Sequence, residues 1–221
     1  MKKITVLSAF ALMSSIGYSQ SWSAIGLSQT NNTKYHAVPQ QIGLEGNINY
    51  FEEYQPGAVF FDDSTAVEVP LLNYNLLVNK LTLKINSDEF FIPNENKVDS
   101  FKIANKTFVQ VPDLSAKNKF YEIIFNENNL ELIKETHAQI VTGKEGTGMT
   151  PTTPDRIKKT NRYYLAKNGK YHEFDLNKNS IIDLLGKEKE INEFRKEKKL
   201  KFKNEEDVVQ ILDYYNSIQN L

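Results

Sequence analysis

Three histidines are the side chains best suited to acid–base or metal chemistry in this 221-residue chain, which contains no cysteine. They are His36, His137 and His172, and no second histidine follows any of them at metal-ligand spacing. The chain carries none of the short motifs of serine hydrolases, zinc proteases, P-loop enzymes or dinucleotide-binding enzymes. The absence of cysteine excludes thiolate catalysis and thiolate metal sites. The sequence therefore predicts no catalytic residue, no metal site and no cofactor.

Adjacent acidic side chains occur at Glu52-Glu53 and at Asp62-Asp63. Neighbouring residues of a strand point to opposite faces of a sheet, so adjacency in sequence does not form a catalytic pair. General acid–base catalysis needs two carboxylates that converge across a cleft. A hydrolase with an unrecognised carboxylate site stays open as a minor alternative.

The spacing Asp175-x-Asn177-x-Asn179 resembles the beginning of a calcium-binding loop. The pattern then fails, because Ser180 stands where the loop needs glycine and Gly186 stands where a bidentate glutamate should close the site. Short polar side chains that cap a strand-to-helix turn explain the same residues. We therefore predict a cap at this position rather than a calcium site.

The segment 187–203 is the one strong cluster of charge, with basic residues outnumbering glutamates. Such a cluster attracts anionic partners such as lipid headgroups or a cell-wall polymer. The alternative is an exposed helix on which Glu and Lys are interspersed. The candidate contacts are Arg195, Lys196, Lys198, Lys199, Lys201 and Lys203.

Residues 1–19 have the pattern of a cleavable bacterial signal peptide, with cleavage between Ser19 and Gln20. Lys2 and Lys3 form a short positive region, and residues 4–16 are uncharged and mostly apolar. This apolar run is shorter than the roughly 20 residues that a transmembrane helix needs, and no later stretch is apolar enough to span. We expect an exported protein, either periplasmic or extracellular, without a transmembrane span.

Two further properties of the composition limit the partners of the chain. A diacylglyceryl lipoprotein needs a cysteine after its signal region, and the chain has none, so we expect no lipid anchor. The formal net charge is −1, whereas general nucleic-acid binders usually carry a marked basic excess. We therefore predict no nucleic-acid partner, and an unknown envelope protein or polymer remains.

After a flexible leader at 20–41, the chain alternates between short runs of β-forming residues and turn residues over 42–176. The run 80–85 places Leu81, Leu83 and Ile85 on one face and polar residues on the other. Asn168-Gly169 is a strong hairpin signal. Residues 142–160, rich in Gly, Pro and Thr, are expected to form a long mobile loop.

At Asn177 the apolar period changes from two to about 3.6 residues, which predicts two or three helices over 177–221. Ser180 and Asp183 resemble a capping box, and Asn204 is placed to cap the last helix. The fold class is therefore α+β: an antiparallel meander of about nine strands followed by C-terminal helices. A sheet of that length must curl, so a curled sheet, a half-barrel, a barrel or a sandwich is expected.

Several motifs stand out along the chain: residues 49–59 (NYFEEYQPGAV), 69–75 (VPLLNYN), 79–81 (NKL), 205–207 (EED) and 214–216 (YYN). Together they resemble a family of exported Bacteroidota proteins of unknown function. The chain departs from that family at Leu72, which stands in place of an arginine, and at Asn79-Lys80, which stand in place of an acidic pair. The resemblance covers most of 45–221 and implies an α+β fold without a known activity.

Asp63-Ser64-Thr65 is similar to the sequence used for O-glycosylation in the periplasm of such bacteria, and it lies at a predicted hairpin tip. Ser64 is therefore a candidate modification site. The function we expect is a non-enzymatic binding or structural module of the cell envelope. The alternative is a periplasmic carrier that holds a small apolar ligand in a curled sheet, with the loop 142–160 as a lid.

Overall fold

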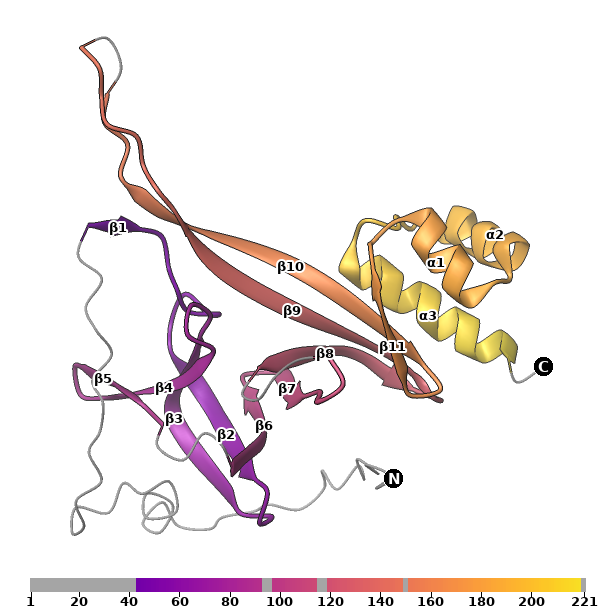
Figure 1. Ribbon diagram of the computed structural model, residues 1–221. Coiled ribbons are helices and arrows are strands. Elements are labelled where there is room, and N and C mark those ends of the chain that lie inside the picture. The colour runs from indigo at the N-terminus through magenta and orange to yellow at the C-terminus, as the bar shows by residue number, and fades with distance from the viewer. Residues whose placement is uncertain (1–42, 93–96, 115–118, 149–150, 220–221) are drawn as a thin grey trace.

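The structure is a computed structural model that describes residues 43–92, 97–114, 119–148 and 151–219. The predicted signal peptide, its cleavage site at Ser19 and Gln20, and the leader 20–41 lie outside the described residues. An eleven-stranded sheet is followed by three helices, which confirms the α+β class (Figure 1). The strands are β1 (Leu44–Glu45), β2 (Gln55–Phe61), β3 (Ala66–Asn75), β4 (Lys80–Ile85), β5 (Asp88–Phe91), β6 (Val98–Ile103), β7 (Lys106–Gln110), β8 (Phe120–Glu127), β9 (Leu130–Val141), β10 (Asp155–Lys167) and β11 (Lys170–Phe174). The helices are α1 (Lys178–Leu185), α2 (Glu188–Lys198) and α3 (Glu205–Gln219).

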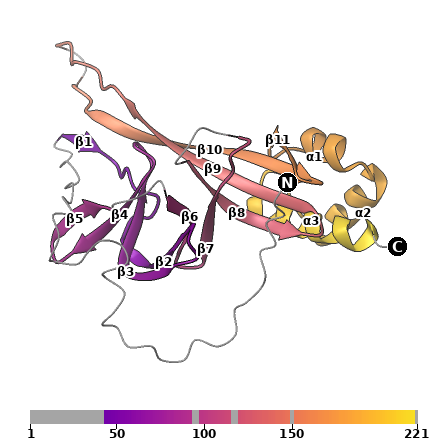
Figure 2. The same ribbon diagram turned by 60° about the horizontal axis from the view of Figure 1, so that its bottom comes forward.

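The sheet consists of two antiparallel meanders, β2–β5 and β6–β11, joined where β2 pairs with β6. The structure therefore differs from the predicted single meander of about nine strands in both the number and the order of its strands. The pairing order runs from β1 through β10 to β5 without returning on itself, so the sheet is open and does not form a closed barrel. Figure 2 shows the β2–β5 meander at one end of the molecule and the helices at the other, with the long β9–β10 ribbon between them.

Tight turns connect most neighbouring strands, as the turn residues predict. Asn168 and Gly169 both have positive φ values, 56° and 79°, between paired residues Lys167 and Lys170. This is the backbone that a two-residue hairpin of the primed type requires. Ser64 (φ 67°) lies in the β2–β3 turn.

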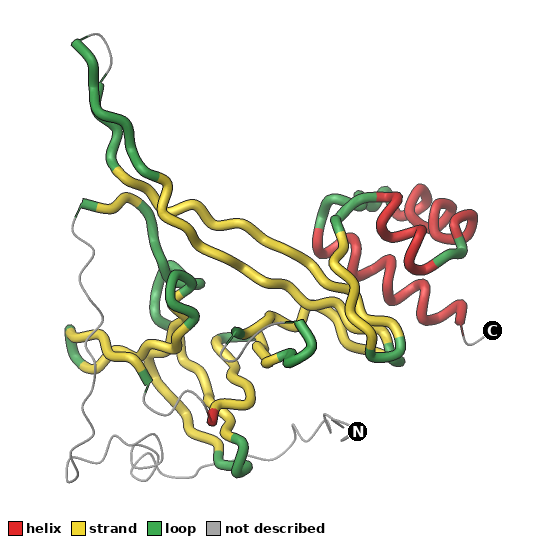
Figure 3. Tube along the Cα trace, in the orientation of Figure 1, coloured by secondary structure: helices red, strands yellow, loops and turns green. Residues whose placement is uncertain are grey.

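The loop between β9 and β10 is shorter than the predicted 142–160, because β10 begins at Asp155 and pairs with β9 from Arg156 onward. The two chains continue side by side past the sheet, with a backbone hydrogen bond of 2.9 Å from Thr153 to Lys144. A Cβ on Gly143 would lie 1.8 Å from the carbonyl oxygen of Thr153, so only glycine permits this close approach. Figure 3 shows this arm projecting beyond the strands.

Two hydrophobic cores lie at opposite ends of the sheet. Aromatic rings dominate the first core, where Phe101 stacks on Phe108 with 4.6 Å between ring centroids and contacts Phe120 at 4.9 Å. In the second core the helices cover the other end of the sheet, with Ile181 and Ile211 packed among residues of β8 to β11. One end of the sheet is thus packed mainly by aromatic side chains of the strands, and the other end is covered by the helices.

The predicted alternation of β4 is only partly correct. Leu81 and Leu83 are buried as expected, but Thr82 on the other face is fully buried as well. The reason is Tyr54, whose hydroxyl lies 3.1 Å from Oγ1 of Thr82. The segment before β2 therefore covers a face that the sequence pattern assigned to solvent.

The N-terminal cap of α1 differs from the predicted capping box, whereas that of α3 agrees with the prediction. Asn177 caps α1, because its side chain accepts a hydrogen bond from the backbone N–H of Ser180 at 2.9 Å. Ser180 therefore lies inside the helix, and the predicted capping box with Asp183 was wrong. Asn204 caps α3 as expected, accepting from the N–H of Asp207 at 2.9 Å.

Candidate functional site

A buried ion pair lies between the two hydrophobic cores, on the face of the sheet that the helices cover. Glu122 of β8 and Lys134 of β9 are direct partners across the two strands. Their Oε2 and Nζ atoms are 2.8 Å apart, and their side chains are only 3% and 8% exposed. Buried charges are stable only when paired and hydrogen-bonded, so this pair needs further partners.

Those partners come from segments distant in sequence. Glu205, in the first turn of α3, lies 3.0 Å from Nζ of Lys134. The hydroxyl of Tyr163 in β10 donates to Glu205 at 3.0 Å. Lys106 of β7 and the hydroxyl of Tyr50 both contact Glu122. We call these six side chains the buried polar network: Tyr50, Lys106, Glu122, Lys134, Tyr163 and Glu205.

Burial and the contacts within the network shift the pKa values of Glu122, Tyr50 and Tyr163. Burial raises the pKa of Glu122, but hydrogen bonds from Lys106, Lys134 and Tyr50 outweigh it and hold that pKa below its usual value. Burial, together with the charge of Glu122, raises the pKa of Tyr50 far above its usual value. Burial and the charge of Glu205 raise the pKa of Tyr163 to about 12. Glu122 is therefore ionised and both tyrosines are neutral at pH 7.

Two carboxylates, those of Glu122 and Glu205, thus converge on one point, which is the geometry that acid–base hydrolysis would need. Lys134 lies between them and pairs with both. A general acid needs a raised pKa, whereas that of Glu122 is lowered. The network consequently holds α3 and the segment around Tyr50 against the sheet.

A second polar cluster lies on the opposite face of the same strands. Glu135 of β9 is buried and pairs with Lys119 at 2.5 Å. The hydroxyl of Tyr164 donates to Glu135 at 3.2 Å, and that of Tyr171 contacts Glu131. Burial and the charge of Glu135 raise the pKa of Tyr164 to about 12. This cluster also satisfies its own charges internally.

Beyond this cluster, the same face of the β9–β10 ribbon becomes basic and exposed. Alternate residues of β10 point to one face, and here they are Arg156, Lys158, Thr160 and Arg162, all exposed. We call these four side chains the basic ribbon face. Across β9, the first three stand opposite residues that are not acidic, and Arg162 stands opposite Glu135. On the other edge, Arg156 is in register with Glu45 of β1.

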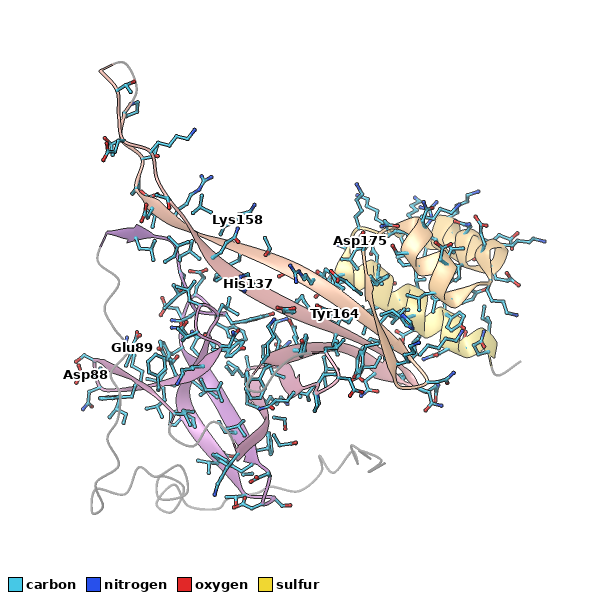
Figure 4. All side chains as sticks on the ribbon, viewed as in Figure 1. Asp88, Glu89, His137, Lys158, Tyr164 and Asp175 are labelled. Atoms are coloured by element: carbon cyan, nitrogen blue, oxygen red, sulfur yellow. The ribbon has the colours of Figure 1, made fainter. Side chains whose placement is uncertain are left out.

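The three cations of the basic ribbon face have no hydrogen-bond or ion-pair partner among the residues that the structure describes. Figure 4 places Lys158 and His137 on neighbouring strands of the ribbon, with Tyr164 further toward the helices. The predicted loop 142–160 contains two of these cations, Arg156 and Lys158, so this surface was not among the predicted sites. The signal was present in the alternation of Arg156, Lys158, Thr160 and Arg162, which has the period of a strand.

The basic residues predicted as anion contacts lie in the last turn of α2 and directly after it, and they differ in exposure. Lys196, Lys198, Lys199, Lys201 and Lys203 are exposed. Arg195 instead turns inward: it donates to the carbonyl oxygen of Leu200 at 3.1 Å, and its guanidinium lies 5.3 Å from the ring centroid of Phe202.

The exposed lysines of this cluster also have local structural roles. Lys198 pairs with Glu197 at 3.1 Å, and cations at a helix C-terminus offset its dipole.

The candidate modification site, Ser64, is exposed at the tip of the β2–β3 hairpin. Its neighbour Asp63 accepts a hydrogen bond from the N–H of Thr65 at 2.9 Å. Hydrogen bonds from Thr65 hold the pKa of Asp63 below its usual value. The hydroxyl of Ser64 is therefore accessible beside an ionised carboxylate.

No protein-family model, curated protein or solved structure matches this chain. Within the described ranges, no cluster of three or more histidines and carboxylates could hold a metal ion. None of the helices in the described part of the chain has the length and apolar character to cross a membrane.

Proposed function

We propose that this protein is an exported, non-enzymatic binding module of the bacterial cell envelope, and that it binds an anionic partner through the basic ribbon face. The observation that supports this most strongly is the set of three exposed cations, Arg156, Lys158 and Arg162, that are unpaired within the described residues. An array of charges of one sign raises the local concentration of oppositely charged partners.

The geometry of this array suits an extended partner. Alternate residues of a strand are about 6.6 Å apart, so the array from Arg156 to Arg162 is about 20 Å long. It lies on a ribbon whose opposite face is anchored, because Nζ of Lys159 donates to the carbonyl oxygen of Asn49 at 2.6 Å. The cations therefore lie in a line on a fixed support. A linear polyanion or an acidic peptide matches such a line better than a compact anion does.

The basic ribbon face is a better candidate than the cluster after α2. Arg195 is engaged by Leu200 and Phe202, and the neighbouring lysines follow a helix C-terminus where cations are stabilising in any case. The ribbon cations have no comparable structural role within the described residues.

The carrier alternative finds no comparable support. The sheet is open, and the rings of Tyr74, Phe101, Phe108 and Phe120 pack on one another in the first core. A ligand would have to displace these contacts. The hydrolase alternative fares no better, because Lys134 bridges the two converging carboxylates.

Binding to isolated envelope fragments tests the proposal. We expect wild-type protein to cosediment with fragments of its native envelope, and R156Q/K158Q/R162Q to remain in the supernatant. The matched control K196Q/K199Q/K201Q removes the same number of charges at the C-terminal end of α2 and should cosediment like wild type. Equal sedimentation of all three proteins would contradict the assignment of the surface. Recovery of the protein only from the cytoplasmic fraction of the native cells would contradict export.

A further inference from the structure

The outer edge of β10 carries two short strands, with a vacancy between them. β1 pairs with β10 only at Asp155 and Arg156. β11 pairs with it from Tyr163 to Lys167. Between these two contacts, residues 157–162 of β10 have no strand partner on this edge among the described parts of the chain. Figure 1 shows β1 and β11 at opposite ends of β10.

The turn between β10 and β11 shows which backbone groups face this vacancy. Lys167 and Lys170 flank a two-residue turn, and such residues form a hydrogen-bonded pair. Odd-numbered residues of β10 therefore direct their N–H and C=O toward the β11 side, and even-numbered residues direct theirs toward β9. Lys159 and Asn161 consequently present their N–H and C=O groups to the vacant edge.

The flanking chain leaves the edge at both ends of the vacancy. Gly46, directly after β1, has a φ of 97°, a backbone conformation in which a residue with a side chain would be strained. At this glycine the chain turns away from the edge of β10. A Cβ at Gly46 would lie 3.2 Å from Cβ of Ile157, so the chain passes close to β10 there. At the other end β11 stops at Phe174, opposite Tyr163, before the chain enters α1. The vacant stretch of six residues is about 20 Å long, enough for one added strand of ordinary length.

Charge indicates which kind of strand fits. Lys158 and Arg162 stand on one face of the vacant stretch and Lys159 on the other, and all its ionisable side chains are basic. Within the stretch, Arg162 has an acidic neighbour in the register, Glu135 of β9, which already pairs with Lys119. Glu45 of β1 and Glu173 of β11 belong to the flanking strands. Lysines at an exposed edge discourage pairing with a second copy of the same edge. An added strand with glutamate or aspartate on alternate residues would instead place its carboxylates on the face of Lys158 and Arg162 and gain charge-assisted contacts with both.

We propose that an extended acidic polypeptide segment adds a strand to β10 between β1 and β11. Its backbone pairs with Lys159 and Asn161, and its carboxylates meet Lys158 and Arg162. This mode of peptide recognition takes affinity from main-chain hydrogen bonds and specificity from the alternate side chains. The inference rests on the proposed function and specifies its partner as a protein segment rather than a polysaccharide.

One substitution separates backbone pairing from charge. N161P removes an N–H that faces the vacancy and that the β9 ladder does not use, a position where an edge strand tolerates proline. N161A is the matched control, because it removes the same side chain and keeps the N–H. The probe is a short blocked peptide of alternating threonine and glutamate, long enough to span residues 157–162. We expect N161P to weaken its binding about tenfold, which corresponds to one lost hydrogen bond, and N161A to leave it unchanged.

A second measurement keeps the test independent of the folding of N161P. Two methylated peptides are compared, one N-methylated at the odd-numbered and one at the even-numbered backbone nitrogens. Only one of these two sets of N–H groups faces β10 in an added strand, so one of the two peptides should lose binding to wild-type protein. Equal affinity of both methylated peptides and the parent peptide would overturn the inference. So would equal binding of the parent peptide to N161P and N161A.

A linear acidic polysaccharide, polygalacturonate, distinguishes this inference from the proposed function. It carries carboxylates but has no backbone amides to pair with β10. If wild type binds the polysaccharide and not the peptide, and R156Q/K158Q/R162Q binds neither, the added strand is excluded and the basic ribbon face stands. If wild type binds neither probe, both proposals fail.

Discussion

Glu122 and Lys134 face each other across β8 and β9 with 2.8 Å between Oε2 and Nζ, at the boundary between the two hydrophobic cores. Lys134 reaches on to Glu205 of α3, and Glu122 is contacted by Tyr50 from the segment before β2. One buried pair therefore connects the segment before β2 and helix α3 to the middle of the sheet.

Replacing Glu122 should destabilise the fold strongly. E122Q leaves Lys134 and Lys106 without their shared carboxylate inside the protein, and breaking a buried pair in this way costs about 3–5 kcal/mol. Denaturant unfolding measures the change. The control E127Q alters an exposed glutamate of the same strand and should stay within about 0.5 kcal/mol of wild type. A loss as small in E122Q as in E127Q would contradict the structural role of the network.

Replacing Glu205 should loosen α3 from the sheet. E205Q removes the carboxylate that accepts from both Lys134 and Tyr163, and we expect a loss of about 2 kcal/mol in the free energy of unfolding. Glu206 is exposed in the same turn, so E206Q controls for the loss of an acidic charge near the helix N-terminus. Amide hydrogen exchange should show faster exchange in α3 of E205Q only. The same exchange rates in both variants would argue against a link through Glu205.

The stability of the protein should fall in acid because of Glu122. Its pKa is lower in the folded protein than the ordinary 4.5, so the unfolded chain binds the proton more readily. The stabilisation is complete above pH 4.5 and is lost as the pH falls through the lower folded pKa. Thermal unfolding at a series of pH values from neutral downward measures this slope. E122Q should show a shallower decline, and an identical pH dependence in both proteins would refute the assignment.

Glycosylation of Ser64 predicts a mass increment on the protein recovered from its native cells. Intact mass spectrometry should give one glycan mass on wild type and none on S64A, since Ser64 is exposed at the hairpin tip. T65S is the control, because it keeps a hydroxyl residue after Ser64. An unmodified wild-type mass would exclude this site.

Local features of this fold could be predicted from the sequence, because a few adjacent residues determine them. Asn168-Gly169 has the backbone preference that its turn needs, and Asn204 caps the helix that follows it. The change from a period of two to one of about 3.6 at Asn177 located the helices. Each of these depends on residues within one turn of one another.

Contacts between distant segments could not be predicted in the same way. Tyr50 and Glu122 are 72 residues apart, and Lys134 and Glu205 are 71 apart, so no local pattern connects them. Thr82 was assigned to solvent because the covering Tyr54 belongs to another segment. The basic ribbon face was not predicted for a local reason. The Gly, Pro and Thr residues before Asp155 led to the prediction of a loop up to residue 160, although β10 and its alternating pattern begin at Asp155.

The most direct test of the basic ribbon face is the salt dependence of binding to polygalacturonate. Each cation that contacts a polyanion releases counter-ions, so log K falls with log salt concentration in proportion to the number of contacts. We predict that R156Q/K158Q/R162Q binds at least about tenfold more weakly than wild type, with a slope shallower by about 3, while K196Q/K199Q/K201Q keeps the wild-type affinity and slope. Equal losses in the two variants would mean that general charge governs binding, and a loss only in the second would move the site to the end of α2.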